Sequence, residues 1–260
     1  MLHKYPVLII SKDRATTCTT HKLLDQEGIN LYYCVEPQDY DNYVEVVGKE
    51  NVINIQENDQ GIAYTRNFCI KWSLDQGYEK HWQFDDDITK FMYRGWNKIK
   101  GFRDRVTITD PLKMMLHIEE ICDRFKNFGA ASLSHDAFAF TMKRDIYINK
   151  MVYCCYLINN KTDCNFENHT SVDVDFSCQL LSKKFITLKF NIYTFLTPPS
   201  GTSPGGCNSS HDYLNSGRKK RNEKLVQDWY PWFVEYEKKG QSEIKPSQIW
   251  NSFTHKPILK

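Results

Sequence analysis

Three consecutive carboxylates, Asp85, Asp86 and Asp87, are the side chains of this sequence whose types and spacing most clearly suggest chemistry. They follow the segment His-Trp-Gln-Phe, which otherwise has the composition of a buried strand. Adjacent like charges repel and resist desolvation, so a fold usually keeps them where a cation or a strong donor compensates. Oxygen-rich, imidazole-poor clusters suit Mg²⁺ or Mn²⁺. The alternative is a solvated turn in which Asp residues cap the next segment.

A divalent ion on this Asp triplet would most naturally hold a diphosphate, because Mg²⁺ and Mn²⁺ are usually bound by one or two carboxylates together with substrate phosphates. Such an ion neutralises a leaving diphosphate as charge develops. The sequence has no Gly-x-x-x-x-Gly-Lys-Ser/Thr loop, and no Gly-x-Gly-x-x-Gly follows the first predicted strand. P-loop kinases and dinucleotide dehydrogenases are therefore disfavoured, and nucleotide-sugar transfer is favoured.

Strands and helices alternate along the chain up to the triplet. Strands are predicted at Tyr5–Ser11, Leu31–Val35, Asn51–Ile55 and Lys80–Phe84, with helices at Thr19–Gln26, Tyr40–Val47 and Gly61–Asp75 between them. This order indicates right-handed crossovers and a mainly parallel sheet. Ligands of such sheets gather outside the carboxyl ends of the strands, so the triplet is expected at the functional edge.

The second half of the chain is less regular. We predict helices at Pro111–Phe125 and Val174–Leu181, strands at Ala130–Phe140, Met151–Leu157 and Ile186–Leu196, a Pro/Gly/Ser loop at Thr197–Gly206, and a basic helix at Arg218–Lys224 before an aromatic tail. The segment Arg94–Arg105 is predicted to be irregular, basic and interleaved with aromatic residues. The helix at Val174 is entered from the acidic pair Asp173 and Asp175.

Composition limits the classes of protein. The chain has 260 residues, 25% of them charged and 41% apolar, as in an ordinary globular enzyme. A net charge of +2 is too small to indicate a polyanionic partner, so that argument must rest on local clusters. Nine scattered cysteines without a Cys-x-x-Cys pair predict a reducing compartment. Without an apolar run of about 18 residues, we expect a soluble cytoplasmic protein, and we expect it to be a monomer.

These features together resemble the GT-A class of nucleotide-sugar glycosyltransferases. The first strand ends at Ser11 with Arg14 in the following loop, and the second ends at Glu36. Gly61–Asn67 looks like the Gly-x-Ala-x-x-Arg-Asn segment of that class, and the triplet looks like its Asp-x-Asp strand end. The residues Val-Asp-Val-Asp-Phe from 172 to 176 resemble its Glu-Asp-x-Asp acceptor-side motif, with Val172 in place of the expected acid.

The resemblance implies an α/β, GT-A (Rossmann-like) fold, with a mixed, mainly parallel sheet flanked by helices and a C-terminal helical and loop extension. It implies one domain over residues 1–260. Residues 1–110 would be the nucleotide-sugar-binding half, and residues 111–260 the acceptor-binding half with the basic, aromatic extension.

A narrower resemblance is to the TET-associated, phage-type DNA-base glycosyltransferases. It rests on Glu36-Pro37 through Tyr43, on the Asp-Asp-Asp-Ile quartet ending at Ile88, and on Gly205-Gly206 followed by a basic helix. It covers the chain from about residue 5 to its end. It implies transfer of a sugar from a nucleotide-sugar such as a UDP-sugar, with Mn²⁺ or Mg²⁺, to a 5-hydroxymethylpyrimidine in double-stranded DNA. The protein would act in the host cytoplasm if phage-encoded.

The resemblance to GT-A enzymes implies roles for several residues on the donor side. Asp87 and Asp85 would bind the metal, Asp85 would also contact the ribose or uracil, and Asp86 would support either role. The nucleotide or its diphosphate would be contacted by Arg14, Glu36 and Arg66. The alternative for Arg66 is an ordinary surface position on its helix.

On the acceptor side, Asp173 matches the general base of inverting enzymes, with Asp175 beside it in the motif. The alternative for Asp173 is the N-cap of the following helix. His211 would complete the metal site, and the alternative is a solvated loop histidine.

Two basic patches could bind DNA phosphates, and their aromatic residues could stack on bases. The first contains Arg94, Trp96, Lys98, Lys100 and Arg103, and the second contains Arg218, Lys219, Lys220 and Arg221. The alternative is two solvated faces. The function could also be GT-A transfer to a protein or glycan, or DNA binding without catalysis.

Overall fold

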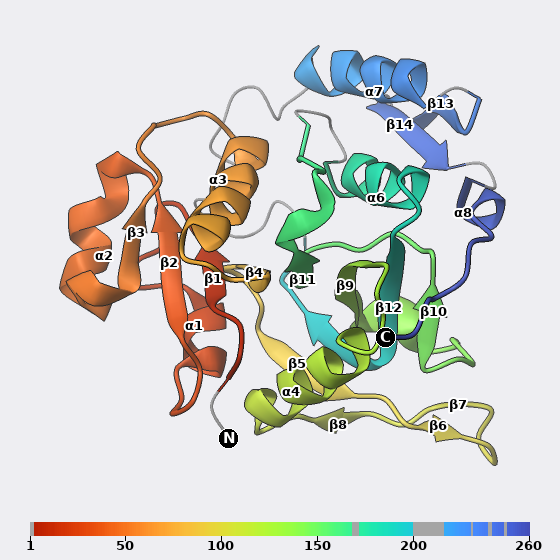
Figure 1. Cartoon of the computed structure of the whole chain (residues 1–260), viewed down its shortest axis with the longest axis horizontal. Helices are drawn as coiled ribbons and strands as arrows, with labels where there is room; N and C mark the ends of the chain where they lie inside the picture. Colours follow the sequence, from red (N-terminus) through yellow and green to blue (C-terminus); the bar gives the residue numbers. More distant parts are fainter. Residues whose placement is uncertain (1–2, 168–171, 200–215, 230, 239–240, 247–248) are drawn as a thin grey trace.

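The computed structural model describes residues 3–167, 172–199, 216–229, 231–238, 241–246 and 249–260. One ten-stranded sheet runs through the centre of the molecule (Figure 1). Its strands, in sheet order, are β3 (Val52–Asn54), β2 (Leu31–Val35), β1 (Val7–Ile10), β4 (Lys80–Asp85), β11 (Tyr156–Asn159), β9 (Phe128–His135), β12 (Ile186–Leu196), β5 (Lys90–Tyr93) and β8 (Val106–Thr107), with β10 (Ile146–Ile148) paired to β12. This confirms the predicted α/β fold with a mainly parallel sheet flanked by helices.

The first four strands are parallel, as the alternation of strands and helices predicted. In this part of the sheet β1 lies between β2 and β4, with Ile10 in register with Asp85. The helices of the crossovers are α1 (Thr19–Leu24), α2 (Tyr40–Val47) and α3 (Ile62–Asp75). Because parallel strands end at a common edge, the carboxyl ends of β1, β2 and β4 bring their following loops together.

Strand β11 is the antiparallel member in the middle of the sheet, paired with β4 on one side and β9 on the other. Two successive antiparallel pairings make β9 run in the same direction as β4, and β12 is parallel to β9. The carboxyl ends of β4, β9 and β12 therefore point to the same edge, where the amino end of β11 also lies.

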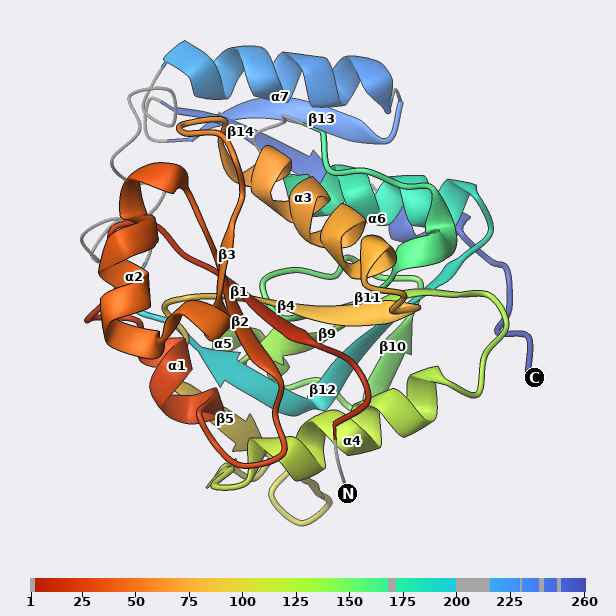
Figure 2. The same ribbon diagram turned by 60° about the vertical axis from the view of Figure 1, so that its left-hand side comes forward.

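Helices cover both faces of the sheet (Figure 2). On one face, α3 and α6 (Val172–Ser182) pack on residues such as Ala130 and Ile158. On the other, α4 (Pro111–Cys122) packs Met114 and Met115 against Trp82 in the largest apolar cluster. Among the described residues, no helix is long and apolar enough to cross a membrane.

Three predicted segments of the second half need correction. The strand predicted at Ala130–Phe140 ends at His135, and the short helix α5 (Asp136–Ala139) follows. The strand predicted at Met151–Leu157 is β11, which begins only at Tyr156. The segment predicted to be irregular at Arg94–Arg105 contains a small hairpin, β6 (Trp96–Asn97) with β7 (Phe102–Arg103).

The C-terminal extension contains more than the predicted helix and loops. Helix α7 (Ser216–Asp228) includes the predicted basic helix and is followed by the hairpin of β13 (Phe233–Lys238) and β14 (Gln241–Pro246), and then by α8 (Ile249–Ser252). Leu225, Phe233 and Ile249 form one apolar cluster with Val174 of α6. The extension is thus packed onto α6.

Candidate active site

The Asp triplet occupies a tight turn at the carboxyl end of β4, and α1 holds its backbone in place. The Thr20 hydroxyl donates to the carbonyl of Asp85 (2.7 Å) and accepts from the N–H of Ile88 (2.9 Å). The N–H of Thr20 donates to the carbonyl of Asp86 (3.2 Å). One threonine therefore holds the backbone of the turn that carries the three carboxylates.

Asp86 points into the protein and is buried, so the alternative of a solvated turn is wrong for this residue. Its carboxylate accepts from the Ser11 hydroxyl (2.5 Å) and forms an ion pair with Arg14. Because Ser11 donates its only proton to Asp86, the hydroxyl of Tyr43 must donate to Ser11 (2.5 Å). Burial raises the pKa of Asp86, and the hydrogen bond from Ser11 and the charge of Arg14 oppose that rise. Asp86 thus joins the ends of β1 and β4.

Asp85 and Asp87 stay partly open to solvent, with 29% and 33% of their side chains exposed. Burial, followed by the charges of Asp85 and Asp86, raises the pKa of Asp87 to about 6. The guanidinium of Arg14 lies 3.9 Å from Asp87 and opposes this rise. The two outer carboxylates are therefore the members of the triplet that a ligand can reach.

Arg66 of α3 lies beside Asp85 and is only 3% exposed, which rules out the surface position considered for it. Its Nη2 donates to Asp85 (2.8 Å) and its Nη1 donates to Gln83 (3.3 Å). The guanidinium lies over the rings of Tyr156 (4.9 Å) and Phe166 (5.5 Å). Its Nε has no hydrogen-bond partner among the described residues. Arg66 thus brings a charge with one unused donor to the end of β4.

A chain of buried side chains behind Arg66 fixes the face of β4 that it contacts. The amide of Gln83 donates to the Arg66 carbonyl (3.0 Å) and to Nε2 of His81 (2.8 Å). Since Nε2 of His81 accepts, its Nδ1 must donate to Asn160 (2.5 Å). Burial lowers the pKa of His81 to about 4, in agreement with a neutral imidazole.

Asp173 lies in the first turn of α6. The hydroxyl of Tyr156 donates to its Oδ1. Burial raises the pKa of Asp173, and the negative charge of Asp85 raises it as well, whereas the charge of Arg66 lowers it. Asp85 and Asp173 therefore act on the same guanidinium from two different elements.

Asp175, predicted as a second catalytic carboxylate, has a different environment. It is 2% exposed and accepts hydrogen bonds from the indole of Trp229 (2.7 Å) and from Gln179 (2.6 Å). These contacts tie the C-terminal extension to α6. Asp175 therefore links α6 to the C-terminal extension, and its catalytic role stays a prediction. Asp173 is the carboxylate whose pKa the charge of Arg66 lowers.

The predicted nucleotide-pocket residues Arg14 and Glu36 lie at the ends of β1 and β2. Arg14 lines a hollow of about 530 Å³ together with Asp13, Asp39 and Tyr43. Glu36 is buried, and its Oε2 pairs with Lys12 (2.8 Å) and accepts from Gln38 (2.6 Å). Both residues lie at the expected edge, and Glu36 has one carboxylate oxygen already engaged.

The first basic patch is divided between the interior and the surface. Arg94 and Arg103 are buried, so they do not offer freely exposed charge to DNA phosphates as predicted. Trp96 is half-buried, with the Arg103 guanidinium 6.0 Å from its ring, whereas Lys98 and Lys100 are exposed.

In the second basic patch, Lys220 on α7 is exposed. The side chains of Arg218, Lys219 and Arg221, and the whole of His211, lie outside the residues that the structure describes.

The donor set fits a divalent ion that is shared with a substrate. Over the described part of the chain, no three His, Cys, Asp or Glu side chains gather into a metal-binding group. The protein offers the two half-exposed carboxylates of Asp85 and Asp87, which is the number that Mg²⁺ usually takes from protein when phosphates complete its shell.

Sequence reasoning missed two polar residues of this edge. Tyr156 was only part of a predicted strand, and Lys189 of β12 attracted no attention. Strand register could have found them, because Gln83 faces Tyr156, and Ser132 of β9 is in register with both Tyr156 and Lys189. Lys189 lies 4.5 Å from the ring of Tyr153, and burial lowers its pKa to about 8.

Three solved structures are similar to this chain at low identity. The first, assigned as a nucleotide-diphospho-sugar transferase from Desulfovibrio desulfuricans G20, has 10% identity and a TM-score of 0.46 over 87% of this chain and 98% of its own. A UDP-glucose pyrophosphorylase complexed with UDP-glucose has 8% identity and a TM-score of 0.41 over 76% and 92%. A CMP:2-keto-3-deoxy-manno-octonic acid synthetase complexed with CTP has 11% identity and a TM-score of 0.43 over 87% and 100%.

No curated protein matches the chain. The model of one family, described as TET-Associated Glycosyltransferase, matches residues 5–197, which include the Asp triplet, Arg66 and Asp173. The chain belongs to the TET-associated glycosyltransferase family.

Proposed function

We propose that this glycosyltransferase is metal-dependent and moves a sugar from a UDP-sugar to a 5-hydroxymethylpyrimidine of DNA, in the setting of phage DNA modification. The observation that carries the proposal is the arrangement around Arg66. Asp85 at the end of the donor-side strand and Asp173 on the acceptor-side helix act on one buried guanidinium. A donor and an acceptor bound at these two carboxylates would meet beside Arg66.

On the donor side, the half-exposed carboxylates of Asp85 and Asp87 would hold Mg²⁺ or Mn²⁺ together with the diphosphate. The ion supplies charge neutralisation for the leaving nucleoside diphosphate when it is bound. Arg66 would add a fixed positive charge, since its buried Nε has no partner among the described residues. A charge that is already positioned needs little reorganisation during the reaction.

On the acceptor side, Asp173 is the candidate base. Tyr156 donates to Oδ1, and Oδ2 has no hydrogen-bond donor among the described residues. We infer that Oδ2 takes the proton of the hydroxymethyl group. The hydroxymethyl oxygen then forms the bond to the anomeric carbon, and the bond from that carbon to the diphosphate oxygen breaks. Burial favours this role, because it raises the pKa of Asp173 and so makes its carboxylate a stronger base.

The DNA acceptor is supported by exposed cations. Lys98 and Lys100 on the hairpin and Lys220 on α7 are available for phosphate contacts. A hydroxymethyl group at the pyrimidine 5-position projects into the major groove, so double-stranded DNA can present it without leaving the stack.

The test incubates the protein with Mn²⁺, a panel of UDP-sugars and DNA in which the pyrimidines are hydroxymethylated, and measures nucleosides by mass spectrometry. We expect a mass increase of one sugar residue on the modified base. In Asp87→Ala the transfer should fall to background while thermal unfolding is unchanged. The matched control, Asp75→Ala, removes an exposed carboxylate from the end of α3 and should leave transfer intact.

The results separate the parts of the proposal. If no donor modifies the DNA, the acceptor assignment fails. Full activity of Asp87→Ala would remove this carboxylate from the metal site. If the sugar is instead found on protein or glycan, and duplex binding is absent even at low salt, the alternative acceptor class takes the place of DNA.

A further inference from the structure

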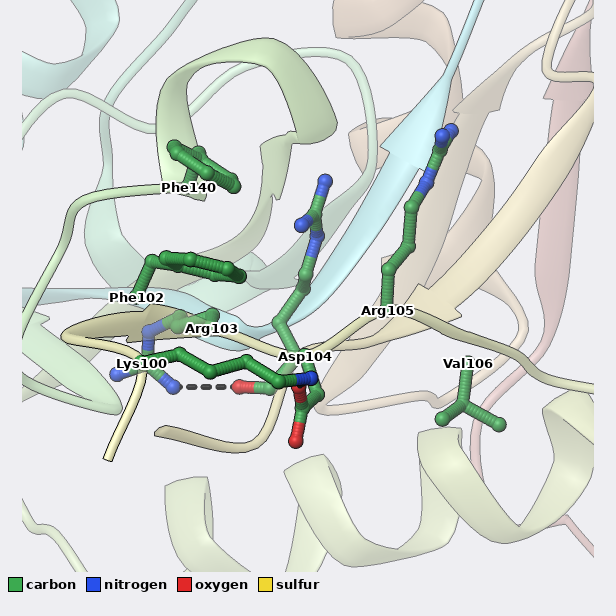
Figure 3. A pocket seen from close by; sticks show the side chains of 8 residues that line it. Lys100, Phe102, Arg103, Asp104, Arg105, Val106 and Phe140 are labelled. Atoms are coloured by element: carbon green, nitrogen blue, oxygen red, sulfur yellow. Dashed lines mark hydrogen bonds and ion pairs between the residues drawn. The ribbon is translucent and has the colours of Figure 1, made fainter. Parts of the chain in front are cut away.

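A pocket lies between the β6–β7 hairpin and α5, and none of the candidate active-site carboxylates lines it (Figure 3). We propose that this hairpin pocket binds the acceptor strand beside the reacting base, with Lys100 and Arg105 on a phosphate and the ring of Phe140 against a neighbouring base. The inference rests on the proposed function in taking the acceptor to be a nucleic acid, and it assigns a separate subsite to it.

The hairpin pocket has the size and lining of a nucleotide site. Its volume is about 620 Å³, within the usual range of ligand clefts. It is lined by Arg94, Lys100, Phe102, Arg103, Asp104, Arg105, Val106 and Phe140. Figure 3 shows the rings of Phe102 and Phe140 one above the other beside Lys100, with Arg105 further along. Cations and flat apolar rings thus share one cavity.

The inner arginines hold the pocket together. Asp136 of α5 receives two hydrogen bonds from Arg94 (2.7 and 2.6 Å) and one from the hydroxyl of Thr194 (2.7 Å). Arg103 donates to the carbonyls of Arg94 (2.5 Å) and Met142 (2.6 Å). These bonds attach the hairpin to α5 and to the sheet, so the pocket is a built feature of the fold.

The outer cations are available to a ligand. Arg105 is 49% exposed and shares Asp136, at 3.2 Å, with the closer Arg94. Lys100 is 55% exposed and pairs with Asp104 at 2.9 Å. The exposed Lys100–Asp104 pair contributes about 0–1 kcal/mol, so a phosphate can replace Asp104 at little cost. Asp136 is buried and keeps its closer partner Arg94, so Arg105 can turn to a phosphate without leaving that carboxylate unpaired.

The aromatic residues favour a nucleic acid over an acidic protein. The rings of Phe102 and Phe140 are stacked, with centroids 4.9 Å apart and planes at 23°. Phe140 is 45% exposed. Phe138 on α5 and Ile99 in the turn between β6 and β7 are also exposed. A base can stack on such a ring whatever its identity, and the adjacent cations follow the backbone. An acidic peptide would use the cations and leave the stacked rings unoccupied.

The place of the hairpin pocket in the sheet predicts how long an acceptor must be. Helix α5 follows β9, which lies two strands from β4 and ends at the same edge, whereas the hairpin follows β5, which is antiparallel to β12 and leads away from that edge. At about 4.8 Å per strand, the α5 side of the hairpin pocket lies roughly 10 Å from Asp85 along the sheet edge, and the hairpin side lies further away. A strand rising 3.4 Å per nucleotide covers this distance in about three nucleotides, so an acceptor that reaches the pocket needs a flank of at least about three nucleotides.

The experiment measures transfer to single hydroxymethylpyrimidines in oligonucleotides with flanks of one to twelve nucleotides. For the wild type we expect the acceptor KM to fall by about tenfold as the flank grows beyond the predicted span. Phe140→Ala and Arg105→Gln should each raise KM for the long acceptor by about fivefold to tenfold. They should leave kcat, the donor KM and the KM of the shortest acceptor unchanged.

Matched controls come from the exposed face of α3. Leu74→Ala removes an exposed apolar side chain, and Lys71→Gln removes an exposed cation, so they match Phe140→Ala and Arg105→Gln. Both should leave the acceptor KM unchanged. Thermal unfolding of every variant identifies loss of fold. An unchanged KM for long acceptors in Phe140→Ala and Arg105→Gln would overturn the assignment, as would an equal change for the shortest acceptor.

A binding assay without donor separates this inference from the proposed function. Labelled unmodified oligonucleotides of three and twelve nucleotides are titrated with wild type and variants at two salt concentrations. If the longer strand binds and Phe140→Ala weakens it, the hairpin pocket stands even where no transfer is found. If a poly-glutamate peptide competes as well as the oligonucleotide, or if neither variant weakens binding, the assignment to a nucleic acid is wrong.

Discussion

Replacement of Arg66 by methionine should cost both stability and sugar transfer, because one buried guanidinium compensates carboxylates from two elements. Methionine keeps the length and apolar stem of the side chain and removes the charge. Asp85 then loses its 2.8 Å partner and Asp173 loses the charge that lowers its pKa. The two rings that the guanidinium covers lose their cation contacts as well.

The magnitude follows from these contacts. Removing one partner of a buried ion pair typically costs about 3–5 kcal/mol. Asp85 is 29% exposed, so water recovers part of that cost, while two lost cation–ring contacts add about 0.5–1 kcal/mol each. We therefore expect the free energy of unfolding to fall by about 3 kcal/mol. Transfer should fall by about 100-fold or more, as when a positioned electrostatic group is removed from an active site.

The assay is urea unfolding at pH 7 with kinetics on the same preparations. Arg66→Lys keeps a charge but loses the planar fork that reaches Asp85 and Gln83, so its stability should lie between those of wild type and Arg66→Met. Lys71→Met on the exposed face of α3 is the control and should stay within about 0.5 kcal/mol. If Arg66→Met also stays within 0.5 kcal/mol and transfers sugar normally, Arg66 does not link the two carboxylates.

Other residues give three further tests. Asp173→Asn should abolish transfer, while calorimetry should show an unchanged affinity for the donor. Asp175→Asn should keep transfer, but its free energy of unfolding in urea should fall by about 1–2 kcal/mol, because the substitution weakens the hydrogen bond from Trp229. Burial lowers the folded-state pKa of His81 to about 4, so the unfolded state binds more protons than the folded state between pH 4 and 6.5. The free energy of unfolding should therefore fall by about 3 kcal/mol when the pH is lowered across that range. The fall should be smaller in His81→Gln. The pKa of Lys189 is lowered to about 8, so stability should rise from pH 8 to 10.5, and Lys189→Met should abolish that rise in pH-dependent urea unfolding.

The parallel half of the fold could be predicted because local pattern and tertiary structure agree there. The strand at Leu31–Val35 and the helix at Tyr40–Val47 have the predicted boundaries, and Gly48, with φ of 85°, ends the helix where a residue without Cβ is favoured. Short β-branched runs between such stop signals leave few alternatives.

The errors of the second half arise from contacts distant in sequence. Apolar residues continue from β9 through Phe138 and Phe140, which suggested a longer strand. The chain turns at Asp136 because Arg94 and Thr194 bind its carboxylate, and His135 caps the short helix by accepting from Ala137 (3.3 Å). Periodicity in one segment cannot reveal partners on two other strands.

The late start of β11 has a similar cause. Val152 is apolar and its neighbours resemble a strand, yet its N–H donates to the Ser177 hydroxyl of α6 (3.1 Å), so no strand partner is available to it. Cys154 has a φ of 59°, which turns the backbone just before the strand begins. The side chain that captures this segment lies 25 residues further along the chain.

The position of the triplet could be predicted from sequence, but the division of work within it could not. Alternation along the chain is compatible with either the middle or the outer carboxylates pointing inward. The choice is made by Ser11 and Arg14 on the neighbouring strand and loop, which bind Asp86. Likewise, the sequence shows Arg94 and Arg103 as part of a basic run, and only their contacts show that they are internal.

Among the buried arginines, Arg14, Arg66 and Arg94 differ in the exposure of the carboxylates that they pair with. Arg14 neutralises Asp86, and Arg94 neutralises Asp136, and both of these acids are buried. Arg66 is different, because it binds the half-exposed Asp85 and also acts on Asp173. A nearly neutral net charge conceals this distribution. The sheet edge thus holds its buried acids against guanidinium groups, whereas the guanidinium of Arg14 lies 3.9 Å from the partly exposed Asp87. In the proposed function, Asp87 and Asp173 are the carboxylates that meet the donor and the acceptor.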